Sequence, residues 1–192
     1  MRLKFKLVIV VVLFLGGCVW AQKNTSSPYS RFGYGILNDK SLALGQSMGN
    51  TGISLRSSKH LNFVNPASLM AIDSGNVILE VGIKSQFFTF KLKGDKANSS
   101  NTNMEYIAAG FPIAKWWKTG FVMMPFSKVG YNFKEVSKIE DIDYETSNLG
   151  SGGFNQVVFS NAIQPVIGLS LGLNVVYVFG EAQYTAYNYI LS

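Results

Sequence analysis

Residues 168–180 carry the pattern that most restricts the fold, because their side chains alternate in character from one position to the next. Six successive odd positions are apolar: Leu169, Leu171, Leu173, Val175, Tyr177 and Phe179. The positions between them are mostly small or polar, with Val176 and Val178 as interruptions. Side chains alternate between the two faces of a β-strand, so the pattern predicts a strand with one apolar face. At about 3.3 Å per residue, such a strand can cross a bilayer when it is tilted.

The composition of the whole chain agrees with strands in a membrane. Charged residues make up 15% of the 192 residues, against about 25% in average soluble domains, while hydrophobic residues make up 47%. Beyond the N-terminus there is no run of about 18 apolar residues, which a membrane-spanning helix requires. A membrane β-barrel needs no such run, because lipid-facing and lumen-facing residues alternate. We therefore expect an all-β fold, a transmembrane antiparallel β-barrel whose first strands lie within residues 75–192.

Four further strands are expected before residues 168–180. They cover residues 76–92, 104–113, 120–133 and 154–163. In the first of them the apolar face changes from Val77, Leu79, Val81 and Ile83 to Phe88, Phe90 and Leu92, which predicts a bulge or kink near residues 85–87. Pro125 predicts a kink or an edge position in the third strand.

The segments between the expected strands alternate in length. Residues 93–103 and 134–153 are expected to form long polar loops, whereas residues 114–118 and 164–165 form short turns. Outer-membrane barrels have short periplasmic turns and long external loops, so the pattern predicts the side on which each segment lies. Trp116 and Trp117, flanked by Lys115 and Lys118, have the composition expected at a membrane–water boundary.

The first 21 residues are expected to be a signal peptide. Arg2, Lys4 and Lys6 precede an apolar stretch at residues 7–15 that is too short to span a bilayer, and cleavage is expected after Ala21. A lipoprotein signal with Cys18 as the lipidated residue is the alternative. Loss of the three basic residues would reduce the formal charge from +6 to +3, and the remaining basic residues form no cluster suited to nucleic acid. The sequence therefore indicates export and localisation to the outer membrane.

About five strands are expected, whereas bacterial single-chain barrels have at least about eight. An open sheet in lipid would leave unpaired backbone groups, each costing several kcal/mol. We therefore expect the chain to be the N-terminal part of a longer protein. The alternative is that it obtains the missing strands by oligomerising.

Residues 22–74 are rich in glycine, serine and asparagine and are expected to form a separate segment before the strands. They contain Ala-Leu-Gly-Gln-Ser-Met-Gly-Asn-Thr-Gly at residues 43–52 and Asn-Pro-Ala-Ser-Leu at residues 65–69. Together with the strand at residues 168–180, these motifs resemble the FadL/TodX-type outer-membrane transport family, over most of residues 30–180. The resemblance implies an N-terminal hatch inside a barrel. It also implies passive uptake of hydrophobic small molecules such as long-chain fatty acids or aromatic hydrocarbons.

Some members of that family are partners in protein secretion instead of transporters. The alternative function is therefore a non-transporting barrel that acts as a docking or assembly partner in protein secretion across the outer membrane. The partners expected on these two hypotheses are outer-membrane lipid, a hydrophobic small-molecule ligand and a protein of the secretion machinery, with no nucleic acid.

On the transport hypothesis, Asn65, Pro66 and Ala67 form the moving part of the hatch. Phe32, Leu61 and Phe63 would line the gap that receives the ligand. Binding would be driven by desolvation, about 25 cal/mol per Å² of apolar surface buried. The alternative for residues 65–67 is an ordinary turn that begins a helix, because proline is well suited to the first helical position.

The sequence favours no catalytic or metal site, and no cofactor is expected. His60 is the only histidine, and in its polar surroundings a hydrogen-bonding surface role is favoured over a Ser-His-Asp site. Metal binding would need more histidine or cysteine ligands. The acidic group of Glu140, Asp141, Asp143 and Glu145 lacks the spacing of a calcium loop, so a solvated loop is favoured. We expect that the protein is not an enzyme.

Overall fold

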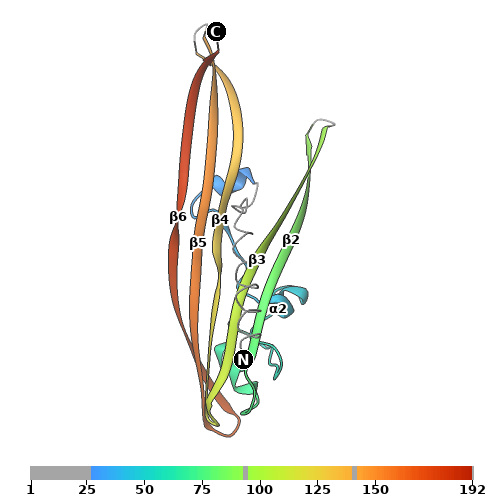
Figure 1. The fold of residues 1–192 in the computed structure, drawn as a ribbon, viewed down its shortest axis with the longest axis vertical. Helices are drawn as coiled ribbons and strands as arrows, with labels where there is room; N and C mark the ends of the chain where they lie inside the picture. Colours follow the sequence, from blue (N-terminus) through green and yellow to red (C-terminus); the bar gives the residue numbers. More distant parts are fainter. Residues whose placement is uncertain (1–26, 93–94, 140–141, 192) are drawn as a thin grey trace, which may run out of the picture.

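A computed structural model describes residues 27–92, 95–139 and 142–191, and it shows one long antiparallel sheet (Figure 1). Five long strands follow one another in chain order, with each paired to the next: β2 (Ile78–Leu92), β3 (Asp95–Ala114), β4 (Trp117–Ile139), β5 (Ile142–Val166) and β6 (Leu169–Leu191). A sixth, two-residue strand, β1 (Ile36–Leu37), pairs with β4. The expected all-β class is confirmed. The sheet is not closed over the described residues, and β2 and β6 form its edges.

Among the described residues, helices are few and short. They are the 3₁₀ helix η2 (Pro28–Arg31), the α-helix α2 (Ala43–Ser47) and the 3₁₀ helix η3 (Pro66–Ala71). Within the described part of the chain, no helix combines the length and the apolar character needed to cross a membrane. The expected signal peptide and Cys18 lie outside the described residues.

The two predicted polar loops are wrong, because most of both segments is strand. Residues 95–103 pair with β2, as far as Leu92 opposite Asp95. Residues 134–139 pair with residues 142–147, with Lys134 opposite Ser147 and Ile139 opposite Ile142, and residues 148–153 pair with residues 128–133. The physical reason is that backbone pairing needs no apolar side chain. An apolar/polar alternation marks only the part of a strand that has one buried or lipid-facing side.

The predicted bulge near residues 85–87 is also misplaced. β2 pairs with β3 without interruption there, as Phe87 lies opposite Ser100. The register shift lies between Gly82 and Ile83, where Gly82 faces Tyr106 and Ile83 faces Met104, so the extra residue is Glu105 of β3. An insertion in the partner strand is not visible in the periodicity of β2.

The position of Pro125 confirms the predicted kink. The register between β4 and β5 shifts between Pro125 and Ser127, which makes Phe126 the extra residue. Pairing of β4 with β3 extends only as far as Ile107 opposite Met123. A proline has no N–H to donate to a neighbouring strand and therefore suits a place where that strand departs.

The sheet consequently divides into two arms above this level. Figure 1 shows the β2–β3 hairpin diverging from the three strands β4–β6. Along the freed edge of β4 runs the N-terminal part of the chain, with Ile36 opposite Lys128 and Leu37 opposite Ser127. We call the opening between β3 and β4 beyond Met123 the fork.

One face of the sheet is covered by the chain before β2. Residues of this segment pack with side chains of β3, β4 and β5 into a single apolar core: Leu42, Leu61, Phe63, Leu69, Met70, Ile72, Tyr106, Ala108, Val122, Met124, Val158 and Ala162. A segment thus covers one face of the sheet, but the sheet of the described residues is open and does not enclose this segment as a hatch in a barrel.

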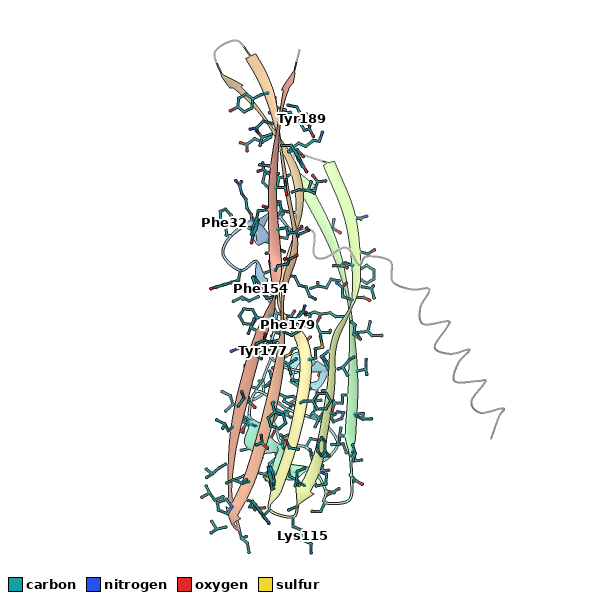
Figure 2. All side chains as sticks on the ribbon, turned by 60° about the vertical axis from the view of Figure 1, so that its left-hand side comes forward. Phe32, Lys115, Phe154, Tyr177, Phe179 and Tyr189 are labelled. Carbon is teal, nitrogen blue, oxygen red and sulfur yellow. The ribbon has the colours of Figure 1, made fainter. Side chains whose placement is uncertain are left out.

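The other face carries exposed apolar side chains on every long strand. Examples are Leu79, Val81, Ile107, Phe121, Phe159, Leu171, Leu173 and Val175. In Figure 2, Lys115 lies at one end of the sheet and Tyr189 near the other, with Tyr177 and Phe179 between them. An apolar surface this extensive is unusual on a soluble monomer.

Candidate functional site

The segment at residues 61–72, which we call the plug, is held together by the buried side chain of Asn62. Its amide donates hydrogen bonds to the carbonyl oxygens of Gly52 and Leu55, and its Oδ1 accepts from the N–H of Val64 at 3.0 Å. The hydroxyl of Ser68 donates to the backbone oxygen of Asn62 at 3.2 Å. Four bonds to one residue fix the loop in the form that presents Leu61 and Phe63 to the sheet.

Asn65 begins η3 as a helix cap. Its Oδ1 accepts from the N–H of Ala67 at 3.2 Å, while its amide donates to the oxygen of Ile53 at 2.7 Å. Pro66 occupies the first turn, where its missing N–H costs no hydrogen bond. The alternative given for residues 65–67, a turn that begins a helix, is therefore confirmed as their local structure.

Glycines in the sheet allow the plug to approach the backbone closely. A Cβ at Gly172 of β6 would lie 2.2 Å from the nitrogen of Ala67, and one at Gly110 of β3 would lie 2.4 Å from Cδ2 of Leu61. Next to Gly172, the amide of Asn174 donates to the oxygen of Phe63 at 2.7 Å. The plug is thus bonded to β6 as well as packed on β3 and β4.

The six residues expected to form a gate and a ligand site are not all brought together. Leu61 and Phe63 are buried in the core, and Asn65, Pro66 and Ala67 follow them directly. Phe32 is 72% exposed and lies next to η2 at a distance along the sheet from Lys115 (Figure 2). No ligand or gating role of these residues is tested by the structure.

A second polar site lies at the base of the fork and was not found from the sequence. Glu105, whose side chain is 4% exposed, accepts from the amide of Asn38 at 2.8 Å and from Nζ of Lys128 at 3.2 Å. Lys84 lies 3.6 Å from the same carboxylate and 3.8 Å from Asp39. This fork cluster joins β2, β3, β4 and the N-terminal segment.

The fork cluster depends on the bulge in β3. The extra residue of a bulge changes the direction of a side chain, and Glu105 is that residue, so it is buried beside the equally buried Tyr106. The cavity next to it, of about 100 Å³, is lined by residues of β3, β4 and β5 that include Met104, Met123, Pro125 and Asn155. Sequence periodicity could have signalled only that one charge falls inside the otherwise apolar stretch at residues 104–113.

Comparison with known proteins decides the family. A family model named BamG matches residues 3–191. The chain belongs to the BamG family. This is a family of the outer-membrane β-barrel assembly machinery, so the BamG-family chain is linked to assembly of β-barrel proteins in the outer membrane. No curated protein and no solved structure matches the chain.

The resemblance to FadL/TodX-type transporters is therefore wrong. The family match is to BamG, and it covers nearly the whole chain, whereas the resemblance depended on short motifs. The Asn-Pro-Ala motif is explained by local structure, since Asn65 caps η3 and Pro66 and Ala67 begin it. Two of the three glycines in residues 43–52 are likewise explained by packing, since a Cβ at Gly45 would meet Ser41 and one at Gly52 would meet Val64. The third, Gly49, has a positive φ of 74°.

The boundary motif at residues 115–118 is only partly as expected in the BamG-family chain. Lys115 and Trp116 are exposed at the β3–β4 turn, and the indole N–H of Trp117 donates to Asn161 at 3.0 Å. Lys118, in contrast, is 2% exposed, and its Nζ donates to the hydroxyl of Ser74 at 3.0 Å. Lys118 therefore lies on the plug side of β4, where its side chain is covered by protein.

Proposed function

We propose that this chain is a membrane-embedded docking and assembly partner within the outer-membrane β-barrel assembly machinery. The observation that carries the proposal is the BamG match over residues 3–191. Two features of the sheet support it, and each is physical: an apolar outer face that suits lipid, and unpaired sheet edges that suit further strands.

The apolar outer face supports insertion in lipid. Leu171, Leu173 and Val175 are between 50% and 66% exposed on β6, and Leu79 and Ile83 are more than 70% exposed on β2. In water such side chains would favour burial by about 25 cal/mol per Å². In a bilayer they need no protein cover, as for the outward residues of membrane strands.

The sheet edges support a role that brings strands together. In the described part of the chain, β2 and β6 each have one neighbouring strand. Unpaired backbone groups in lipid cost several kcal/mol each, so both edges require partners. We propose that these partners are further β-strands, from the same polypeptide or from a protein of the machinery.

The covered inner face favours a docking role. Leu61, Phe63 and Leu69 are at most 4% exposed and pack directly against the sheet. Two hydrogen bonds fix the plug at both sides. The amide of Asn174 donates to the oxygen of Phe63, and the N–H of Leu61 donates to the carboxylate of Glu80 at 2.7 Å. A segment held in this way stabilises a surface, and such a role needs no bond chemistry.

We also propose that the protein is not an enzyme. His60 is paired only with the nearby Glu80 in the described contacts, at 3.7 Å, and its side chain is 52% exposed. Among residues 27–92, 95–139 and 142–191, no group of three histidine, cysteine or acidic side chains could hold a metal ion. Of the acidic group, Glu140, Asp141 and Asp143 lie outside the residues whose side chains are described, and Glu145 is paired with Lys134 at 2.7 Å.

The experiment is depletion of the protein together with purification from membranes. Depletion should lower the amount of folded, heat-modifiable β-barrel proteins in the outer membrane, and a tagged full-length protein should co-purify with the machinery in mild detergent. Unchanged barrel levels on depletion, together with a protein that migrates alone, would refute the docking role.

Matched variants separate membrane insertion from docking. L171N and L173N place amides on the outer face of β6 and should reduce the amount of protein in the outer membrane. V136N makes the same kind of change at an exposed site on the polar upper part of β4 and should not. Equal membrane levels of all three variants would contradict a lipid-facing β6.

Export of the chain is part of the same proposal. We propose that residues 1–21 are removed as a signal peptide, as their charge and apolar pattern suggest. Mass spectrometry of the N-terminal peptide distinguishes a chain beginning at Gln22 from one beginning with a lipidated Cys18. A retained Met1 would refute export by either route.

A further inference from the structure

The edge of β4 above Met123 is occupied by a segment from far away in the sequence. β3 leaves β4 after the pair Ile107–Met123, and residues 27–38 take its place. The N–H of Ser27 donates to the oxygen of Gly130, and the N–H of Asn38 donates to the oxygen of Phe126, both at 2.9 Å. Between these bonds, Leu37 lies opposite Ser127.

The upper part of β3, residues 95–106, is in register to pair with the same edge of β4. It carries one inserted residue, Glu105, and β4 carries one, Phe126, so the two insertions compensate each other. Continuing the pair Ile107–Met123 past both insertions brings Asn103 opposite Ser127. Ser127, which now lies opposite Leu37, would thus lie opposite Asn103 if β3 and β4 continued to pair.

Polar atoms without a partner mark the same two positions. Among the described residues, the buried side-chain atoms that lack a hydrogen bond are Oδ1 of Asn103, Nδ2 of Asn101 and the hydroxyl of Ser127. A hydroxyl donates and an amide oxygen accepts, so Ser127 and Asn103 are complementary. Buried polar groups in native proteins are nearly always bonded, and this pair would satisfy both.

The fork cluster holds the present arrangement. Glu105 accepts from Asn38 of the N-terminal segment and from Lys128 of β4, and Lys84 lies between the carboxylates of Glu105 and Asp39. Two of these contacts join residues 38–39 to Glu105 of β3 and Lys84 of β2. They must break, together with the backbone hydrogen bonds from Ser27 and Asn38 to β4, for the N-terminal segment to leave the edge.

We propose that β4 is a strand-exchange surface, held by residues 27–38 in this structure and by the upper part of β3, residues 95–106, in a second state. In the second state the fork is closed, Asn103 pairs with Ser127, and the segment containing η2 is released with its exposed Tyr29, Phe32 and Tyr34. The exchange concerns the chain's own strands and stands independently of the proposed role in assembly.

The test uses cysteine pairs in the full-length protein, oxidised in isolated outer membranes. L37C/S127C reports the present state and should form a disulfide readily, since the two residues are opposite one another. N103C/S127C reports the closed fork and should accumulate slowly. N98C/S127C is the matched control, five residues out of register on the same strand, and should not accumulate.

Weakening the cluster should shift the balance. N38A removes the hydrogen bond to Glu105, and the loss of one bond to a charged group should raise the initial N103C/S127C crosslinking rate about tenfold. The same change should lower the L37C/S127C rate. General unfolding would instead lower the register specificity of both cysteine pairs. Opposite changes in the two crosslinking rates therefore distinguish strand exchange from unfolding.

Two results would overturn the exchange. One is that N103C/S127C crosslinks no faster than N98C/S127C, with or without N38A, while L37C/S127C still forms. The other is hydrogen exchange of the amides at residues 95–106 that is identical in protein oxidised through either pair. The expected result is slower exchange of alternate amides in the protein locked through N103C/S127C, because only there does β3 have neighbours on both sides.

Discussion

The side-chain amide of Asn174 in β6 donates a hydrogen bond to the backbone oxygen of Phe63, at 2.7 Å. The same side chain accepts a hydrogen bond from the hydroxyl of Ser160 in β5. A single residue thus joins two strands to the plug, across 111 positions of the sequence. The plug is therefore fastened to the sheet by specific bonds as well as by apolar packing.

Removal of this bond should loosen the plug without unfolding the sheet. N174A leaves the oxygen of Phe63 and the hydroxyl of Ser160 without partners, which typically costs about 1–3 kcal/mol for each buried group. We expect faster hydrogen exchange at residues 61–72 and unchanged exchange in β2. N188A is the control on the same strand, because the exposed side chain of Asn188 contacts only Thr146 of β5 among the described hydrogen bonds. Equal exchange in both variants would contradict the fastening role.

The close contact at Gly172 provides a steric test of the same docking. A Cβ there would lie 2.2 Å from the nitrogen of Ala67, so G172A should displace η3. Overpacking of this kind costs about 1–3 kcal/mol. We expect a lower temperature of heat modification in semi-native electrophoresis. G75A is the control, since no atom lies within 4 Å of its Cβ position. A G172A protein as heat-stable as G75A would show that η3 does not rest on β6.

The sequence predicted the part of the fold in which the two faces of a strand differ in polarity. The alternation at residues 168–180 correctly gave the strand and its outer face, as Leu171 and Leu173 are exposed on β6. Pro125 correctly marked a kink. The prediction from apolar alternation failed for residues 95–103 and 142–153, because serine, asparagine and threonine pair in strands without any such alternation.

The candidate site was less accessible from the sequence, because its contacts are long-range. The burial of Glu105 depends on an insertion in β3 relative to β2, and its partners Asn38 and Lys128 are 67 and 23 residues away. No local pattern encodes such a meeting. Asn65 and Pro66 were correctly recognised as a helix start, but a helix start is a local solution that many folds share, so it could not identify the family.

The charge of Glu105 should be necessary for the joint between the two arms. E105Q keeps an oxygen for Asn38 and nearly the same volume, but it leaves Lys128 and Lys84 without the carboxylate they face. Breaking a buried ion pair typically costs about 3–5 kcal/mol, and the partial exposure of Lys84 places the expected loss near 3 kcal/mol. Urea unfolding in detergent, monitored by tryptophan fluorescence, measures it.

The paired control for E105Q is E145Q. Glu145 also contacts a lysine, Lys134 at 2.7 Å, but Lys134 is 64% exposed. Exposed pairs contribute little to stability, because water screens both charges. A loss in E105Q no larger than that in E145Q would show that the fork cluster does not stabilise the sheet.

The last prediction contrasts two apolar residues that sequence reasoning assigned to one site. Leu61 is 2% exposed and packs against Gly110, so L61A should leave a cavity and cost about 2–5 kcal/mol. Phe32 is 72% exposed beside η2, and F32A should change stability by less than about 0.5 kcal/mol. Unfolding of both variants by urea in the same detergent gives the comparison. Equal losses would mean that Phe32 is covered in the folded protein, and equal stability would mean that the plug does not contribute to the core.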